Sequence, residues 1–292
     1  MAQYYLKNEQ LEICVDSFGA ELKSVKDTKE NREYMWDAKP EYWKRTSPVL
    51  FPFVGGLKDN CYRYDGKVYS MSQHGFARDM EFEIVGHTEK ELTFALNATQ
   101  ETLEKYPFRF RLEIGYVLDG KKLTVSWKVY NQDDKEMYFS IGGHPAFMCP
   151  INEGEVQTDC KILFDVKDSV VSSVIGEGGT LSSRKKTFSL NDGYLNITAD
   201  LFDEDALIIE GDQAHSAALC NHEGNPYLTV EFDAPLFGIW SPVKKNAPFI
   251  CIEPWYGRCD REDFTGDLSQ REWGNKLAPA EQFYASYTIC IN

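Results

Sequence analysis

Apolar and polar residues alternate along much of this 292-residue chain, a pattern typical of β-strands. The alternation is clearest in residues 108–118 and again in residues 123–130, with Asp119 and Gly120 between them. A period of two places successive side chains on opposite faces of a strand, and an Asp-Gly pair favours a tight turn. These residues therefore predict an antiparallel β-hairpin.

Similar short apolar runs, rich in β-branched and aromatic residues, recur between turn residues and predict further strands. They occupy residues 11–15, 81–85, 92–96, 137–141, 161–166, 206–209, 227–232, 237–240, 249–252 and 283–291. Helical periodicity is confined to residues 99–105 and 271–276. Because strands and helices do not alternate, we expect an all-β fold, a large antiparallel β-sandwich or barrel.

The chain shows no sign of a boundary between domains. It contains no Pro-, Gly- or Ser-rich linker, no internal repeat and no shift of charge between its halves. We therefore expect one domain over residues 1–292, from which residues 152–159 and 169–189 extend as excursions.

Charge and cysteine usage narrow the classes of function and the compartment. With 46 acidic and 31 basic residues the net charge is −15, which disfavours binding to nucleic acid and to anionic membranes. The sequence has no secretory signal and no apolar stretch of 18 residues. Its eight cysteines are scattered without a C-x-x-C pair, which suggests free thiols in reducing cytosol rather than disulfides or a metal site. We expect a cytoplasmic protein.

Two histidines stand in unusual local sequences. His144 follows an apolar run and lies between Gly143 and Pro145, so that a constrained turn would present its imidazole at a strand end. His74 begins the sequence His-Gly-Phe-Ala-Arg. Either histidine could be a catalytic group, or simply a half-buried side chain that closes a turn.

Glu253 is the third candidate, because it ends the apolar run at residues 249–252 and precedes Pro254, Trp255 and Tyr256. The carboxylate could be solvated at the rim of the sheet, or it could lie in a cleft beside aromatic rings. Aromatic faces beside a carboxylate suit the binding of a sugar ring. The same rings could equally belong to the core.

Together these motifs resemble the aldose 1-epimerases, or mutarotases, and in particular their LacX-like and hexose-6-phosphate-mutarotase-like branch. The resemblance extends over nearly the whole chain. The matching segments, in order, are residues 11–25 with the Gly-Ala-Glu-Leu turn, 45–52, 74–78, 143–147, 253–257 and 277–281. It implies a galactose mutarotase-like supersandwich that interconverts the α and β anomers of an aldohexose or a hexose 6-phosphate.

The resemblance also implies roles for individual residues. His144 would be the acid, Glu253 the base, and His74 a group near the ring oxygen. Asp205 is the best match to an aspartate that binds sugar hydroxyls, with Asp203 and Asp233 as competitors. Trp255 would contact the sugar.

Arg45 and Arg78 are the arginines nearest these motifs. They could bind a substrate phosphate, or they could pair with core carboxylates. The galactose-specific members of the family carry an Asn-Arg pair in the early loop, whereas this chain has Lys44 and Arg45 there. Galactose itself therefore cannot be assumed.

Ring opening would require His144 to be protonated and Glu253 to be ionised in the resting complex. No metal or redox cofactor is expected, and the partner would be a small sugar or sugar phosphate bound by a monomer or homodimer. A sugar-binding protein without activity and a glycoside hydrolase using Asp205 with Glu253 are the alternatives.

Overall fold

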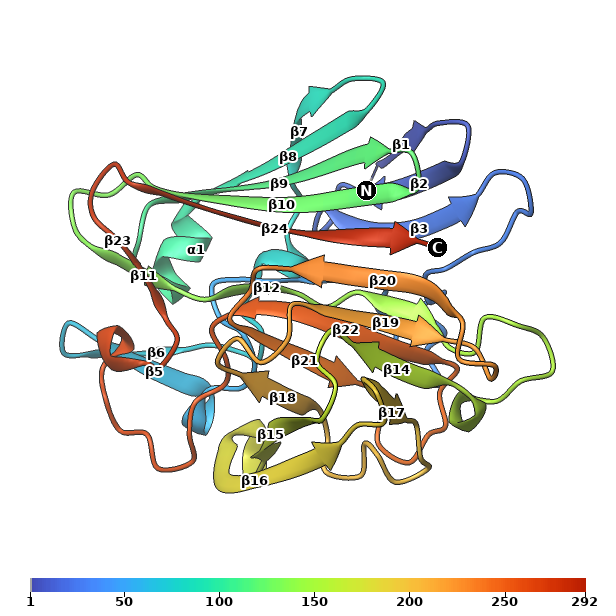
Figure 1. Cartoon of the computed structure of the whole chain (residues 1–292). Helices are drawn as coiled ribbons and strands as arrows, with labels where there is room; N and C mark the ends of the chain where they lie inside the picture. The colour runs from blue at the N-terminus through green and yellow to red at the C-terminus, as the bar shows by residue number, and fades with distance from the viewer. Residues whose placement is uncertain (1) are drawn as a thin grey trace.

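Two large antiparallel sheets form most of this computed structural model, in which residues 2–292 are described (Figure 1). The nine-stranded sheet contains, in spatial order, β17 (Tyr194–Asn196), β14 (Lys161–Phe164), β19 (Ser216–Cys220), β20 (Pro226–Phe232), β24 (Gln282–Ile291), β10 (Lys122–Asn131), β9 (Phe110–Asp119), β8 (Glu91–Asn97) and β7 (Glu83–His87). The eight-stranded sheet contains β16 (Leu181–Ser189), β15 (Ser169–Ile175), β18 (Leu207–Glu210), β21 (Leu236–Trp240), β22 (Phe249–Tyr256), β12 (Ile141–Gly143) and β4 (Val49–Leu50), with β13 (Ala146–Met148) also paired to β22.

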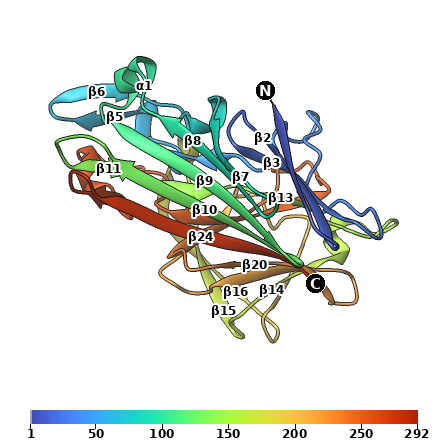
Figure 2. The ribbon, with the colours of Figure 1, turned by 90° about the horizontal axis from the view of Figure 1, so that it is seen from above.

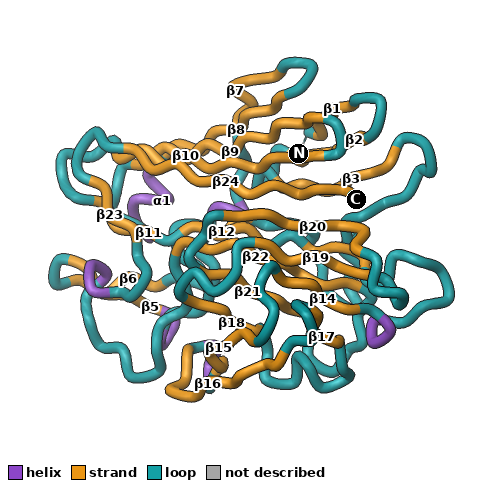
Figure 3. Tube along the Cα trace, viewed as in Figure 1, coloured by secondary structure: helices purple, strands orange, loops and turns teal. Residues whose placement is uncertain are grey.

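Smaller elements flank these sheets, as Figures 2 and 3 show. They are a three-stranded sheet of β1 (Gln3–Lys7), β2 (Leu11–Asp16) and β3 (Glu21–Asp27), the pair β5 (Cys61–Tyr64) and β6 (Lys67–Ser70), and the pair β11 (Met137–Phe139) and β23 (Asn275–Leu277). The α-helix α1 (Gln100–Lys105) and short 3-10 helices at Lys58–Asn60, Ala77–Asp79, Gln157–Asp159, Glu177–Gly179 and Leu268–Gln270 complete the fold. The prediction of a large all-β sandwich is confirmed.

Most of the predicted elements are present, but two predictions are wrong. The hairpin forms as β9 and β10, and Thr99 caps α1 by accepting a hydrogen bond from the backbone N–H of Thr102. Residues 271–276 form no helix, because residues 275–277 pair with β11 instead. Residues 169–189 are no excursion either, since they form β15 and the edge strand β16. Their polar composition misled the prediction, because an edge strand can expose charged side chains.

The alternation along β22 divides its side chains between two faces of the eight-stranded sheet. Ile250 and Ile252 belong to the large hydrophobic core that contains side chains from both sheets. Cys251 and Trp255 belong to two smaller clusters on the opposite face, and Glu253 lies between them in the sequence. The period of two therefore directs Glu253 away from the main core. Other side chains nevertheless bury Glu253, and only 1% of its surface is exposed.

No helix among residues 2–292 has the length and apolar character needed to cross a bilayer.

The packing of Trp255 requires glycine at position 238. A Cβ atom added at Gly238 would lie 2.5 Å from Cη2 and 2.6 Å from Cζ2 of the indole. We predict that Gly238→Ala lowers the free energy of unfolding by about 1–3 kcal/mol in chemical denaturation, because the indole must move. Phenylalanine lacks these two ring atoms, so the same substitution should cost less in a Trp255→Phe background. An equal cost in both backgrounds would show that the indole is not the cause.

Candidate active site

His144 and Glu253 are brought together by strand pairing. β12 and β13 both pair with β22. The two strands share one register on β22, so this register extends through the residues that lie between β12 and β13. His144 is one of these residues and lies opposite Glu253. Side chains that are directly opposite in an antiparallel pair project from the same face. Nε2 of His144 is accordingly 3.3 Å from Oε2 of Glu253.

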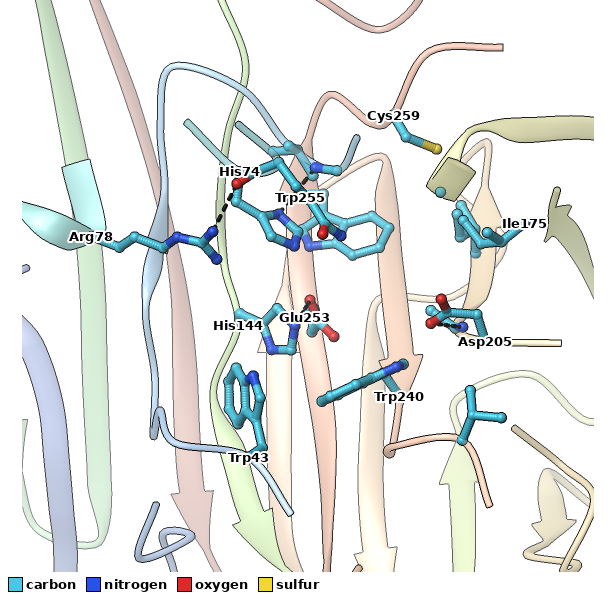
Figure 4. Close-up of a pocket in the computed structure, with 17 residues that line it drawn as sticks. Trp43, His74, Arg78, His144, Ile175, Asp205, Trp240, Glu253, Trp255 and Cys259 are labelled. Carbon is cyan, nitrogen blue, oxygen red and sulfur yellow. Dashed lines mark hydrogen bonds and ion pairs between the residues drawn. The ribbon is translucent and has the colours of Figure 1, made fainter. Parts of the chain in front are cut away.

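Aromatic rings enclose this pair (Figure 4). The indole of Trp43 stacks on the imidazole of His144 with a centroid distance of 4.7 Å, and Trp240 meets the same imidazole edge-on at 5.4 Å. Only 7% of the surface of His144 is exposed. The pair therefore lies in surroundings from which most water is excluded.

A cavity of about 310 Å³ opens over the pair on the outer face of the eight-stranded sheet. Its walls combine large apolar groups with a few titratable ones, as expected of a site for a small molecule. The lining residues are Trp43, Val54, Gly55, Gln73, His74, Arg78, His144, Ile175, Gly179, Asp205, Ala206, Ile208, Trp240, Val243, Glu253, Trp255 and Cys259.

Burial favours uncharged forms of both members of the pair. It lowers the pKa of His144 to about 3, with smaller contributions from Arg78 and Arg45. It also raises the pKa of Glu253 well above its ordinary value, and Asp205 adds to this effect. Burial alone therefore favours neutral imidazole beside protonated carboxyl. The imidazolium and carboxylate expected in the resting complex with sugar hold the same number of protons and the same net charge.

His74 lies beside the pair in a defined tautomer. Its backbone is left-handed, with φ of 68°, and its ring centroid is 5.7 Å from that of His144. Burial holds the pKa of His74 well below its ordinary value. Nδ1 accepts a hydrogen bond of 3.1 Å from the backbone N–H of Gly55. The single proton of the neutral ring is therefore on Nε2, where it can be donated to a ligand.

Asp260 holds the loop that orients His74. Its backbone N–H donates to the carbonyl of Gly56 at 3.0 Å, and its Oδ2 accepts from the backbone N–H of Lys58 at 3.1 Å. Its Oδ1 accepts a 2.6 Å bond from Nε of Arg271, and both side chains are buried. The sequence analysis missed this ion pair, because nothing local to either residue indicates that they meet.

Glu21, of the Gly-Ala-Glu-Leu turn, supports His144 from the other side. Its Oε1 accepts hydrogen bonds from the backbone N–H groups of Thr46 and Ser47, at 2.7 and 2.9 Å. The next residue, Pro48, accepts a 3.1 Å bond from the backbone N–H of His144. The turn therefore helps to fix the strand segment that carries the imidazole.

The two arginines differ in their positions. Arg78 lines the cavity, and its Nη2 donates to the carbonyl of Gln73 at 2.8 Å. Burial lowers the pKa of Arg78 to about 10. Arg45 is not among the lining residues, and its Nη2 donates to Oδ1 of Asp79 at 2.7 Å.

Asp205 and Trp255 line the cavity, whereas the competing candidates Asp203 and Asp233 do not. Asp205 is exposed in a left-handed turn, with φ of 71°, and its Oδ1 accepts a hydrogen bond from the backbone N–H of Ala206. The indole of Trp255 lies between Gly142 and Gly238, where only glycine leaves room for it. The first of these glycines thus serves packing, and it lies in β12 rather than in a turn before His144.

Several lining residues could not be identified from the sequence. Trp43 stands in a polar stretch without periodicity, and Trp240 reads as an ordinary strand residue. Ile175 and Gly179 belong to the hairpin of β15 and β16, which the sequence analysis had treated as an excursion. The eight cysteines carry no disulfide, as predicted, and Cys259 is part of the cavity wall.

A β-sandwich with an aromatic-lined cavity over a buried acid–base pair is suited to chemistry on a sugar, and comparison with known proteins agrees. Residues 2–267 match the aldose 1-epimerase family. The chain is 33% identical over 295 residues to the plasmid-encoded protein LacX of Lactococcus lactis subsp. lactis, with 98% of each chain covered.

Solved structures give the same result. A galactose mutarotase related enzyme from Lactobacillus acidophilus superposes with a TM-score of 0.94 at 36% identity, covering 100% of this chain and 97% of the other. A galactose mutarotase-like protein from Lactobacillus casei gives 0.93 at 29% identity, with both chains fully covered. The protein belongs to the aldose 1-epimerase family, as its motifs suggested, and is thus an isomerase with a mutarotase-like function and a sugar substrate.

The raised pKa of Glu253 has a consequence for stability. Above the ordinary glutamate pKa of about 4.3, the unfolded chain releases this proton while the folded protein retains it, so the cost of burying Glu253 grows as pH rises. We predict that Glu253→Gln raises the free energy of unfolding by about 1–3 kcal/mol at pH 7.5 and by less at pH 5. Urea denaturation at the two pH values measures this. A gain that shrinks as pH rises would contradict the raised pKa.

Proposed function

We propose that the protein interconverts the anomers of a free aldohexose, with His144 and Glu253 as the acid–base pair. The contact between Nε2 and Oε2 at 3.3 Å, inside a buried cavity, is the observation that carries this proposal. Family membership supports a sugar substrate. The indoles of Trp43, Trp240 and Trp255 provide apolar faces for the sugar ring.

Ring opening moves two protons. Glu253 accepts the proton of the anomeric hydroxyl, and His144 donates a proton to the ring oxygen. The ion-pair form that this step requires arises when a proton passes from Glu253 to His144 across their contact, without uptake from solvent. Hydroxyl groups of the bound sugar favour this form, because they donate and accept hydrogen bonds that stabilise both charges.

Ring opening leaves an aldehyde beside neutral His144 and protonated Glu253. This is the form of the pair that burial favours, so the intermediate is accompanied by the less costly protonation state. After rotation about the bond between C1 and C2, Glu253 returns its proton to the carbonyl oxygen. His144 takes the proton of the attacking hydroxyl as the ring closes on the other face.

His74 and Asp205 would orient the sugar. The Nε2–H of His74 is a donor on the same side as His144, and we assign it to an oxygen near the ring. Asp205 presents acceptor oxygens on the opposite wall, where they suit sugar hydroxyls. Together these two contacts would hold the anomeric carbon C1 of the sugar over His144 and Glu253.

The charges of the cavity wall favour a free sugar over a hexose 6-phosphate. Arg78 is the cation of the wall, and part of its guanidinium is already bonded to the carbonyl of Gln73. Arg45 is paired with Asp79 and lies outside the lining. Asp205 and Glu253 add carboxyl groups to the wall, and Asp205 would repel a phosphate.

We predict that His144→Asn and Glu253→Gln each lower the rate of anomer exchange by about 10²–10⁴-fold, because each substitution removes one proton-transfer group. Exchange of glucose, galactose and their 6-phosphates can be measured by polarimetry or saturation-transfer NMR. The exposed His87→Asn serves as a matched control and should leave the rate unchanged.

Each alternative would give a different result in these assays. Binding of sugar without enhanced exchange would indicate a sugar-binding protein, and release of reducing ends from a glycoside would indicate a hydrolase. Exchange that is faster for the 6-phosphates than for the free sugars would contradict the assignment of substrate.

The pKa directions predict an unusual pH profile. Activity requires one transferable proton on the pair, and a second proton binds only near the lowered pKa of His144, about 3. We therefore expect kcat/KM to stay level as pH falls through about 6.5, the ordinary histidine value. Loss of activity on the alkaline side follows the raised pKa of Glu253. An acid limb centred near pH 6.5, with the fold intact by circular dichroism, would contradict these shifts.

A further inference from the structure

A cysteine beneath the acid–base pair has no part in the reaction described above. Cys251 precedes Glu253 by two residues on β22, so both side chains lie on the same face of the sheet. Cys251 is fully buried in the small cluster that contains Trp36, Ala146 and Phe249. One ligand atom each from His144, Cys251 and Glu253 lie within 4.8 Å of one another.

These three atoms could surround one metal ion. Three points within 4.8 Å of one another all lie within 4.8/√3, or about 2.8 Å, of a common point. Zinc bonds to sulfur, nitrogen and oxygen are about 2.0–2.3 Å long. Side-chain rotations that move each ligand atom by about half an ångström would therefore bring all three atoms to bonding distance from one ion. A carboxylate oxygen is also available, because Oε2 of Glu253, which lies 3.3 Å from Nε2 of His144, is buried without a hydrogen-bond partner.

The donor set selects a particular kind of cation. One thiolate, one imidazole and one carboxylate suit zinc and cobalt, whereas magnesium and calcium prefer six or more oxygen ligands. Three protein ligands leave a fourth position open, and the cavity above His144 and Glu253 gives solvent and ions access to it.

We propose that His144, Cys251 and Glu253 form a binding site for a thiophilic divalent cation such as Zn²⁺. Binding displaces two protons to solvent, the proton of the Cys251 thiol and the one proton held by His144 and Glu253, and the cation then occupies both members of the acid–base pair. A bound cation therefore excludes the sugar from the pair, and Zn²⁺ acts as an inhibitor that competes with substrate rather than as a cofactor. The inhibition rests on the proposed function, whereas the binding itself does not.

Binding is tested on the full chain without sugar. Titration with Co²⁺ should produce thiolate-to-metal charge-transfer absorption in the near ultraviolet, and Zn²⁺ should displace it. In Cys251→Ser and Cys251→Ala this absorption should disappear, and affinity for Zn²⁺ should fall by at least about 10-fold. Two substitutions are used so that one failure to fold does not decide the result.

Cys259→Ser is the matched control, because Cys259 lines the same cavity but is not one of the three ligands. It should keep the charge-transfer absorption. His222 contacts Glu155 at the surface, and Sγ of Cys160 lies 4.0 Å from Oε2 of the same carboxylate, so a cation bound there could also give a thiolate band. Only the absorption that the Cys251 variants lose therefore belongs to the proposed site. The proposal is overturned if the wild-type protein shows no thiolate band, or if the Cys251 variants bind Zn²⁺ as tightly as the wild type.

Inhibition is then measured by anomer exchange, with each variant compared with its own metal-free rate. Zn²⁺ should raise the apparent KM for the sugar in the wild type, and the inhibition constant should rise at least about 10-fold in Cys251→Ser. Equal inhibition of both proteins would refute the regulatory part. If the protein showed no exchange at all, the mutarotase proposal would fail, while the cobalt spectra would still decide the metal site.

Discussion

The contact between His144 and Glu253 is the interaction on which the rest of the site depends. Two titratable groups are costly to bury in charged form, and these two face each other across an antiparallel strand pair at 3.3 Å. Burial suppresses the charges of both groups, and in the mechanism that we propose a proton moves between them across this contact. This combination of low charge and a mobile proton suits a reaction that gives and takes protons in both directions.

The fold keeps this pair in position through supports on both sides. Glu21 accepts hydrogen bonds from the loop whose Pro48 carbonyl accepts a hydrogen bond from the backbone N–H of His144. Asp260 is hydrogen-bonded to the loop whose Gly55 N–H fixes the tautomer of His74. Gly238 leaves space for Trp255 beside the carboxyl group. Each support comes from a different part of the chain. The site is therefore a product of the whole sandwich rather than of any one strand.

Much of the fold could be predicted from the sequence, because alternation reports directly on strands and their faces. The same pattern could not decide whether Glu253 lies at a rim or in a cleft, since this depends on what covers that face. Trp43 carries no local signal, because only tertiary packing brings it onto His144. The pairing of Asp260 with Arg271 was invisible for the same reason. The effect of burial on the pKa values of the pair could not be predicted either, because the extent of burial depends on the residues that cover this face.

A crystal structure of the Glu253→Gln variant with a bound aldohexose would test the central claim most directly. The amide preserves the shape of the side chain while it blocks proton transfer. The account predicts a sugar in the cavity with its anomeric hydroxyl within hydrogen-bond distance of residue 253 and its ring oxygen within reach of Nε2 of His144. A sugar bound elsewhere, or one whose anomeric carbon points away from both residues, would contradict it.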